Sequence, residues 1–242
     1  MARVAVIIPA AGKSERFAGE EKKTFAKLDG RPIFLRSLEL FINREDVCQT
    51  ILVVSSSDLS TIKSQYGANL GFMGVQVVTG GEERYQSVAA ALNTVREDAD
   101  LVAIHDAVRP CVTPQMIDAV FAEAQRSGAA ILAAPLTGTI KRVSAAKVVD
   151  ATIDREGLYE AQTPQVFRRD LILAAYRKLP EGVTDDAQTV ERQGQPVTVV
   201  LSDASNIKIT TRADITLASA ILKARPPARP TKAMGAFEEA QW

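Results

Sequence analysis

Six short segments of the chain are almost continuously apolar and rich in β-branched residues, at residues 4–10, 50–56, 75–80, 101–107, 130–136 and 196–201. Runs of this kind are typical of strands that are covered on both faces. Segments with helical spacing of apolar residues lie between them, at residues 33–42, 87–95 and 114–128. Strands that alternate with helices require crossover connections, so the pattern predicts an α/β fold with a mostly parallel, doubly wound sheet.

The end signals of one helix are clear. Thr113 stands at a typical N-cap position, Pro114 at the first helical position, and Gly128 at a typical C-terminal stop. The pattern therefore predicts a complete helix between strands 101–107 and 130–136.

The alternation of strands and helices breaks at residues 137–158. There the sequence predicts two short β-segments around a polar turn, which form a β-arm. Such an arm either exchanges with a second subunit or folds over its own sheet, and the pattern favours neither. We expect residues 1–225 to form a single domain. Residues 226–242 are rich in proline and lack helical spacing, which predicts a disordered tail.

The composition narrows the possible functions. Hydrophobic residues make up 46% and charged residues 24% of the 242 residues, as in an ordinary globular protein. The 29 basic residues balance the 29 acidic ones, so no overall field attracts nucleic acid or a membrane surface. Cys48, Cys111 and the single histidine have no metal-ligand spacing. Because no segment has the character of a signal peptide or a membrane span, we expect a cytoplasmic protein.

The first strand leads into a turn of small residues, "PAAGKSERF" at residues 9–17. Gly12, Lys13 and Ser14 resemble the end of a Walker A loop, but Ile7 occupies the position of its first glycine. The dinucleotide fingerprint also fails, because Ser14 stands where its second glycine belongs. The turn is either a simple connection to a helix or a place where backbone N–H groups approach a phosphate.

Three polar motifs follow strand ends and therefore converge on one edge of the predicted sheet. The first is the small-residue turn, the second is "TGGEERYQS" at 79–87, and the third is "HDAVRP" at 105–110. Arg84 and Ser87 are three residues apart, on one face of a helix. Asp106 ends an apolar strand, and one carboxylate opposite several cations suits a Mg²⁺-nucleotide.

No general base is needed for one class of reaction at such a site. A phosphate monoester has a second pKa of about 6 and is already a dianionic nucleophile at neutral pH. Its attack on a nucleotide needs charge neutralisation and in-line positioning, which lysine, arginine and a metal supply. We therefore expect His105 to be a structural hydrogen-bonding group.

Together these motifs resemble the 2-C-methyl-D-erythritol 4-phosphate cytidylyltransferase family. The resemblance covers residues 4–222 and rests on "PAAGKSERF", "KKTF", "GGEERYQSV", "HDAVRP", "TIKR", "TIDREGLYEAQTPQVF", "TDDA" and "NIKIT", in the order and spacing of the family. It implies a Rossmann-like nucleotidyltransferase domain and a homodimer interlocked by the β-arm. It also implies a reaction of CTP with methylerythritol phosphate in the non-mevalonate isoprenoid pathway, with Mg²⁺ as the cofactor.

The resemblance also assigns roles to individual residues. Arg16, Lys23 and Lys208 would be catalytic, and Asp106 would hold the metal. The residues expected to bind the nucleotide are Ala10, Ala11, Gly12, Gly81, Glu82, Arg84, Ser87, Asp106 and Ala107. Those expected to bind the sugar phosphate are Arg109, Thr139, Arg155, Thr163, Thr184 and Lys208. Thr139 and Arg155 lie on the arm and would reach into the site of the partner subunit.

The sequence departs from the family pattern at three positions. Ser14 stands where glycine is usual, Glu82 where aspartate is common, and Lys22 where proline precedes the catalytic lysine. Sequence register favours Lys23 over Lys22 as the catalytic residue, and Lys22 alone is expected on a solvated face.

Three other functions compete with this interpretation. A ribitol-5-phosphate cytidylyltransferase would share "HDAVRP" and "NIKITT", but "TIKR" and "TIDREGL" favour the erythritol enzyme. A catalytically silent nucleotide-binding module would be expected to lack Arg16, Lys23 or Asp106, and all three are present. A nicotinamide oxidoreductase is disfavoured by the failed glycine fingerprint.

Overall fold

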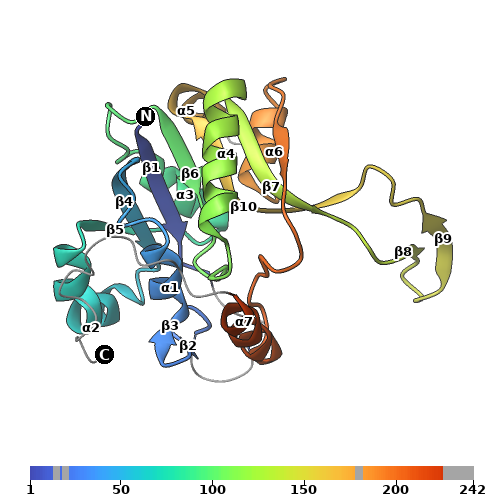
Figure 1. Ribbon diagram of the computed structural model, residues 1–242, viewed down its shortest axis with the longest axis horizontal. Helices are drawn as coiled ribbons and strands as arrows, with labels where there is room; N and C mark the ends of the chain where they lie inside the picture. The colour runs from blue at the N-terminus through green and yellow to red at the C-terminus, as the bar shows by residue number, and fades with distance from the viewer. Residues whose placement is uncertain (13–16, 18–21, 178–181, 226–242) are drawn as a thin grey trace.

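A computed structural model describes residues 1–12, 17, 22–177 and 182–225 of the chain (Figure 1). The predicted disordered tail at 226–242 lies outside the described residues. The described helices are α1 (Ile33–Glu39), α2 (Leu59–Phe72), α3 (Arg84–Leu92), α4 (Pro114–Ser127), α5 (Arg169–Arg177), α6 (Asp186–Glu191) and α7 (Arg212–Ala224).

A seven-stranded sheet forms the centre of the described fold, with strand order β11-β7-β10-β6-β1-β4-β5. Its strands are β1 (Val4–Pro9), β4 (Val47–Val54), β5 (Val75–Thr79), β6 (Leu101–Ile104), β7 (Ala129–Pro135), β10 (Tyr159–Arg168) and β11 (Thr198–Leu201). Strand β1 pairs in parallel with β4 and β6, and β11 pairs in parallel with β7. The predicted mostly parallel α/β sheet is confirmed.

Helices cover both faces of this sheet. Along β1, Val4, Val6 and Ile8 pack with α1, α2 and α4, whereas Ala5 and Ile7 pack with α3, α5 and α6. The alternation follows from the two-residue period of a strand, and it explains why every residue from Val4 to Ile8 is apolar and buried. The sheet is therefore doubly wound, as the pattern predicted.

The end signals predicted for α4 are confirmed. The Thr113 hydroxyl accepts a hydrogen bond from the Met116 N–H at 3.1 Å, and Pro114 is the first helical residue. Gly128 ends the helix with a φ of 91°, a left-handed conformation that glycine adopts without steric cost.

One strand of the sheet was not predicted. Strand β10 runs antiparallel to both of its neighbours, β6 and β7. Pro164 lies inside it, and a proline removes a backbone donor from a strand ladder. The β10–β7 pairing is interrupted between Ala161 and Gln165, and the β10–β6 pairing begins at Gln165, so Pro164 falls at the break in the ladder.

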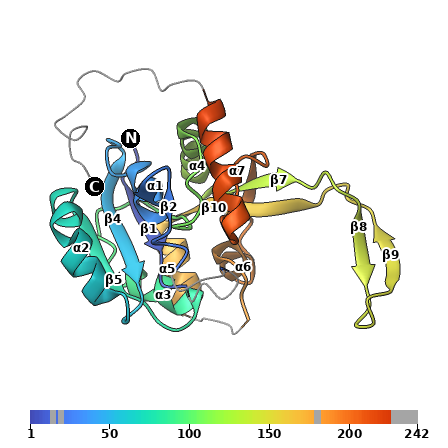
Figure 2. The ribbon, with the colours of Figure 1, turned by 90° about the horizontal axis from the view of Figure 1, so that it is seen from below.

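The predicted β-arm is present as strands β8 (Ile140–Val143) and β9 (Val149–Ile153), which pair antiparallel with each other. Figure 2 shows the arm extending away from the sheet instead of folding over it. Val143, Val148 and Val149 are 47%, 62% and 55% exposed, respectively. The arm therefore presents apolar side chains that its own sheet does not cover.

A smaller unit lies beside the sheet. The short strands β2 (Lys27–Leu28) and β3 (Arg31–Pro32) form a ribbon against which α7 packs. Leu28, Ile33, Val108 and Ile209 are buried in the core of this unit. Among the described residues, no helix combines the length and apolar character needed to span a membrane.

Candidate active site

A cavity of about 180 Å³ lies at the carboxyl edge of the sheet and is lined by residues that follow β1, β5 and β6. Its lining comes from all three motifs and from two further segments, and consists of Pro9, Ala10, Ala11, Gly12, Lys23, Thr24, Glu82, Glu83, Arg84, Ser87, Asp106, Val108 and Lys208. The predicted convergence of the three polar motifs is confirmed.

The turn after β5 requires glycine because helix α3 approaches it closely. A Cβ atom on Gly80 would lie 2.4 Å from the Ser87 Oγ and 2.9 Å from the Val53 Cγ1. The Glu83 N–H donates to the Gln86 Oε1 at 3.0 Å, which satisfies a backbone group at the start of α3. The turn and this contact place Arg84 and Ser87 on the face of α3 that lines the cavity.

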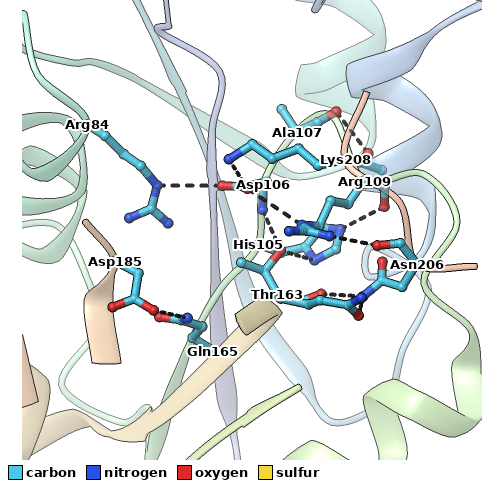
Figure 3. Close-up of polar contacts among 12 residues, drawn as sticks. Arg84, His105, Asp106, Ala107, Arg109, Thr163, Gln165, Asp185, Asn206 and Lys208 are labelled. Atoms are coloured by element: carbon cyan, nitrogen blue, oxygen red, sulfur yellow. Dashed lines mark hydrogen bonds and ion pairs between the residues drawn. The ribbon is translucent and has the colours of Figure 1, made fainter. Parts of the chain in front are cut away.

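Asp106 lies in the cavity wall with cations on three sides (Figure 3). Its Oδ2 lies 2.7 Å from the Lys208 Nζ and 3.7 Å from the Arg109 Nε, and its Oδ1 lies 3.5 Å from the Arg84 Nε. Burial alone would raise the pKa of Asp106, but the three cations outweigh it and hold the pKa well below its ordinary value. Asp106 is therefore an anion at any physiological pH.

His105 is buried behind Asp106 and is bonded at both ring nitrogens. The Arg109 carbonyl can only accept, so the His105 Nε2 carries the ring proton and donates it to that carbonyl at 3.1 Å. The His105 Nδ1 of the neutral ring then accepts from the Thr163 hydroxyl at 3.1 Å, and this hydroxyl also accepts from the Asp106 N–H at 3.1 Å. Burial lowers the pKa of His105 to about 4, so the ring is neutral. Its expected structural role is confirmed.

Arg109 and Asn206 join the segment after β6 to the segment that carries Lys208. The Arg109 Nη1 donates to the Asn206 carbonyl at 2.6 Å, and the Asn206 side chain donates to the Thr163 carbonyl at 3.0 Å (Figure 3). Arg109 is only 4% exposed and does not line the cavity. Its charge acts from behind Asp106.

The two adjacent lysines have different environments. The Lys22 Nζ lies 2.8 Å from the Asp58 Oδ2 and also donates to the Ser55 and Ser57 hydroxyls at 3.3 and 3.2 Å. Lys22 thus remains partly exposed, with 31% of its side chain accessible, and Asp58 at the start of α2 binds its ammonium group. Lys23 lines the cavity. The choice of Lys23 over Lys22 as the catalytic residue stays a prediction.

The other predicted residues divide into several groups. Gly81 lies beside the cavity with Lys22, and Ala107 is buried, with its carbonyl accepting from the Ser37 hydroxyl. Thr184 is exposed on the segment before α6. Thr139 and Arg155 lie on the arm, where Arg155 donates to the Thr137 carbonyl. Arg16 lies outside the described residues.

Several residues at or behind the cavity were not predicted individually. Thr24, Glu83 and Val108 line it, and Asp186 binds Arg84 from the side. Asp186 belongs to the motif "TDDA", so the signal was the second carboxylate of that motif. A charged residue at the start of a helix is usually solvated, and only the packing of α6 against α3 and α5 shows that it is buried.

Comparisons with known proteins agree with this arrangement. The family model "IspD: 2-C-methyl-D-erythritol 4-phosphate cytidylyltransferase" matches residues 4–224. The 2-C-methyl-D-erythritol 4-phosphate cytidylyltransferase of Rhodopirellula baltica is 44% identical over 233 residues, which cover 91% of this chain and 95% of that protein. The one from Acidobacterium capsulatum is 40% identical, with 92% and 98% covered.

Solved structures show the same similarity. The 2-C-methyl-D-erythritol 4-phosphate cytidylyltransferase from Thermus thermophilus superposes with a TM-score of 0.76 at 30% identity, covering 91% of this chain and 99% of that one. The one from Francisella tularensis gives a TM-score of 0.75 at 32% identity, with 91% and 100% covered. The similarity thus spans the sheet, the cavity and the arm together.

Proposed function

The chain belongs to the 2-C-methyl-D-erythritol 4-phosphate cytidylyltransferase family, and we propose that its cavity joins CTP to 2-C-methyl-D-erythritol 4-phosphate. In this reaction a phosphate oxygen of the sugar phosphate forms a bond to the α-phosphorus of CTP. The bond from the α-phosphorus to the bridging oxygen breaks on the opposite side, and pyrophosphate leaves. The products are 4-diphosphocytidyl-2-C-methyl-D-erythritol and pyrophosphate. The observation that carries the proposal is the pairing of Asp106 with Arg84 and Lys208 in a cavity that Lys23 also lines.

The cavity suits this reaction because it supplies positive charges, and the reaction needs no general base. Lys23 and Lys208 line it from two different segments of the chain. Negative charge grows on the phosphate oxygens as the nucleophile approaches, and fixed cations stabilise it without reorganising. Arg16, which lies outside the described residues, is proposed to act with Lys23. The neutral His105 is already bonded on both sides, so it takes no part in proton transfer.

We assign the nucleotide to the side of the cavity formed by the small-residue turn after β1 and the turn after β5. The small residues Ala10, Ala11 and Gly12 allow a ligand to approach the backbone. Glu82, Arg84 and Ser87 face it from α3 and the turn before it, and Gly81 lies beside them. Ala107 would act through its backbone, because its side chain is buried.

The donor set fits a magnesium ion that is held mainly by its substrate. Within the described residues, no three acidic, histidine or cysteine side chains form a metal-binding group. Mg²⁺ usually keeps several waters and takes one or two carboxylates together with substrate phosphates. Asp106 supplies one ionised carboxylate in the cavity wall. The ion would neutralise part of the charge of the triphosphate.

We propose that the arm completes the site of a second copy of the chain. No arm residue is among the described residues that line the cavity of its own chain, and the arm extends away from the sheet (Figure 2). Exchange of arms in a homodimer would cover Val143, Val148 and Val149 and bring Thr139 and Arg155 to the sugar phosphate of the partner. Thr184, which is exposed, would contact the same substrate from within the chain, whereas Arg109 and Thr163 would act from behind Asp106. All three belong to the single domain proposed for residues 1–225.

The test is pyrophosphate release from CTP and Mg²⁺, with methylerythritol phosphate and ribitol 5-phosphate in parallel reactions. Turnover with the first acceptor alone is the expected outcome. Turnover with ribitol phosphate would keep the chemistry and overturn the substrate assignment. Absence of turnover with both would overturn the proposed function.

A further inference from the structure

Asp186 is a fully buried carboxylate to which the proposed chemistry gives no role. It is the first residue of α6 and is 0% exposed. A buried charge is costly unless an opposite charge and hydrogen bonds compensate it. The compensation comes from the Arg84 Nη2, at 2.7 Å from the Asp186 Oδ2, and from the Tyr176 hydroxyl, which donates to the Asp186 Oδ1 at 2.5 Å.

The backbone around Asp186 is held equally firmly. The Gln165 Oε1 accepts from the N–H groups of Asp186 and Ala187 at 3.1 and 2.9 Å. The Gln165 side chain in turn donates to the Asp185 Oδ2 at 2.9 Å (Figure 3). Three elements, β10, α5 and α6, thus fix the position of the Asp186 carboxylate, whose Oδ2 faces Arg84.

Arg84 is therefore shared between two carboxylates, and unequally. Its terminal nitrogen makes the short contact to Asp186, while its Nε lies 3.5 Å from the Asp106 Oδ1. Burial acts to lower the pKa of Arg84, but the charges of Asp186 and Asp106 outweigh it, so the guanidinium remains charged. The Arg84 side chain is 31% exposed and lines the cavity. Its position in the cavity wall thus depends on which carboxylate binds it more strongly.

We propose that Asp186 is a positioning residue that holds Arg84 in its nucleotide-binding position and prevents it from pairing fully with Asp106. This inference rests on the proposed function, because it assumes that the cavity binds CTP. Without the charge of Asp186, the guanidinium moves toward Asp106, the second carboxylate that it contacts. That movement withdraws a cation from the nucleotide and occupies the Oδ1 of Asp106.

The test substitution is Asp186→Asn, which keeps the shape and removes the charge. Asp185→Asn is the matched control, because Asp185 caps α6 through the Gln188 N–H and binds Gln165 without reaching Arg84. Because Asp186→Asn removes the charge that holds Arg84, calorimetry with CTP and Mg²⁺ should show about tenfold weaker binding for this variant. CTP binding to Asp185→Asn should weaken less than about twofold, because the Asp185 carboxylate binds Gln165 and the Gln188 N–H instead of Arg84, and asparagine keeps an oxygen that can accept from the Gln188 N–H.

A double-mutant cycle separates positioning from a general structural role. In an Arg84→Gln background, Asp186→Asn should weaken CTP binding by less than about twofold, since the group that it positions is already gone. An independent tenfold loss in that background would overturn the proposal. Kinetics should show the effect in the KM for CTP, with the KM for methylerythritol phosphate unchanged.

Tyr176→Phe is a milder variant for the case in which Asp186→Asn does not fold. It keeps both charges and removes one hydrogen bond, so about threefold weaker CTP binding is expected. Unchanged CTP affinity in the folded Tyr176→Phe protein, or equal affinities for Asp186→Asn and Asp185→Asn, would overturn the inference. A wild-type protein that binds CTP without turnover would instead overturn the proposed function, and the affinities would still decide the role of Asp186.

Discussion

The cavity around Asp106 and the β8–β9 arm are proposed to serve the same reaction, yet they are built in opposite ways. Asp106, His105 and Arg109 are at most 6% exposed, and their side chains are bonded to segments distant in sequence. The arm has two strands that pair with each other and expose valines. A charged group that must keep one position needs many buried partners, whereas a segment that must reach another molecule has to leave its own core.

The largest expected effect lies in the cavity. Lys23→Ala should lower turnover by about 10²–10³-fold, because it removes a fixed cation from the region where phosphate charge develops. Lys22→Ala is the matched control, since Lys22 is bound to Asp58 and should cost less than about tenfold. Steady-state measurement of pyrophosphate release gives the turnover rate of each variant. Equal losses would contradict the assignment of Lys23.

The buried centre should also make stability depend on pH. His105 has a pKa of about 4 in the folded state and about 6.5 in the unfolded state, so between these values the unfolded chain binds more protons. The free energy of unfolding should therefore fall as the pH falls through this window, by up to about 1.4 kcal/mol per pH unit. Denaturant unfolding at pH 7.5, 6.0 and 5.0 measures this slope.

His105→Gln is the control for this prediction. His105 is the single histidine of the chain, so the difference in slope between the wild type and the variant isolates its titration. The variant should be less stable at pH 7.5, and its stability should depend less on pH. Identical slopes for the two proteins would refute the neutral, buried state of the ring.

On the arm, Arg155→Ala should raise the KM for methylerythritol phosphate by about tenfold, because a guanidinium bond to a phosphate is lost. The KM for CTP should stay the same. Arg142 is an exposed arginine on β8, and Arg142→Ala tests whether the loss of any positive charge on the arm raises the KM for methylerythritol phosphate in the same way. A selective loss of CTP binding in Arg155→Ala would be incompatible with the shared site.

The smallest effect on the fold is expected when the arm is removed. The Leu136 N–H donates to the Leu158 carbonyl at 3.1 Å, so a short Gly-Ser turn can join β7 to β10 in place of residues 138–156. The shortened chain should keep the circular dichroism spectrum of its helices and sheet, because its hydrophobic cores lie on the two faces of the sheet and against α7. It should sediment as a monomer, because the arm is proposed to hold the dimer together. A dimer without the arm, or an unfolded chain, would contradict the role given to the arm.

Much of the fold could be predicted because its signals are local. The apolar runs at 4–10 and 101–107 predict buried strands, and Thr113, Pro114 and Gly128 bound α4 as predicted. Strand β10 could not be predicted in this way, because Pro164 argues against a central strand. Its antiparallel direction depends on β6 and β7, which are adjacent to it only after folding.

The sequence by itself determined the doubly wound sheet, the arm and the edge where the polar motifs meet, because strand ends follow directly from the period of apolar residues. The tertiary structure decided which charges act on one another. Lys22 and Lys23 are neighbours in sequence, but Lys22 pairs with Asp58 whereas Lys23 lines the cavity. Arg84 and Asp186 are 102 positions apart and form an ion pair. Charge interactions depend on distance and burial, and only the packing of α3, α5 and α6 against the sheet sets both.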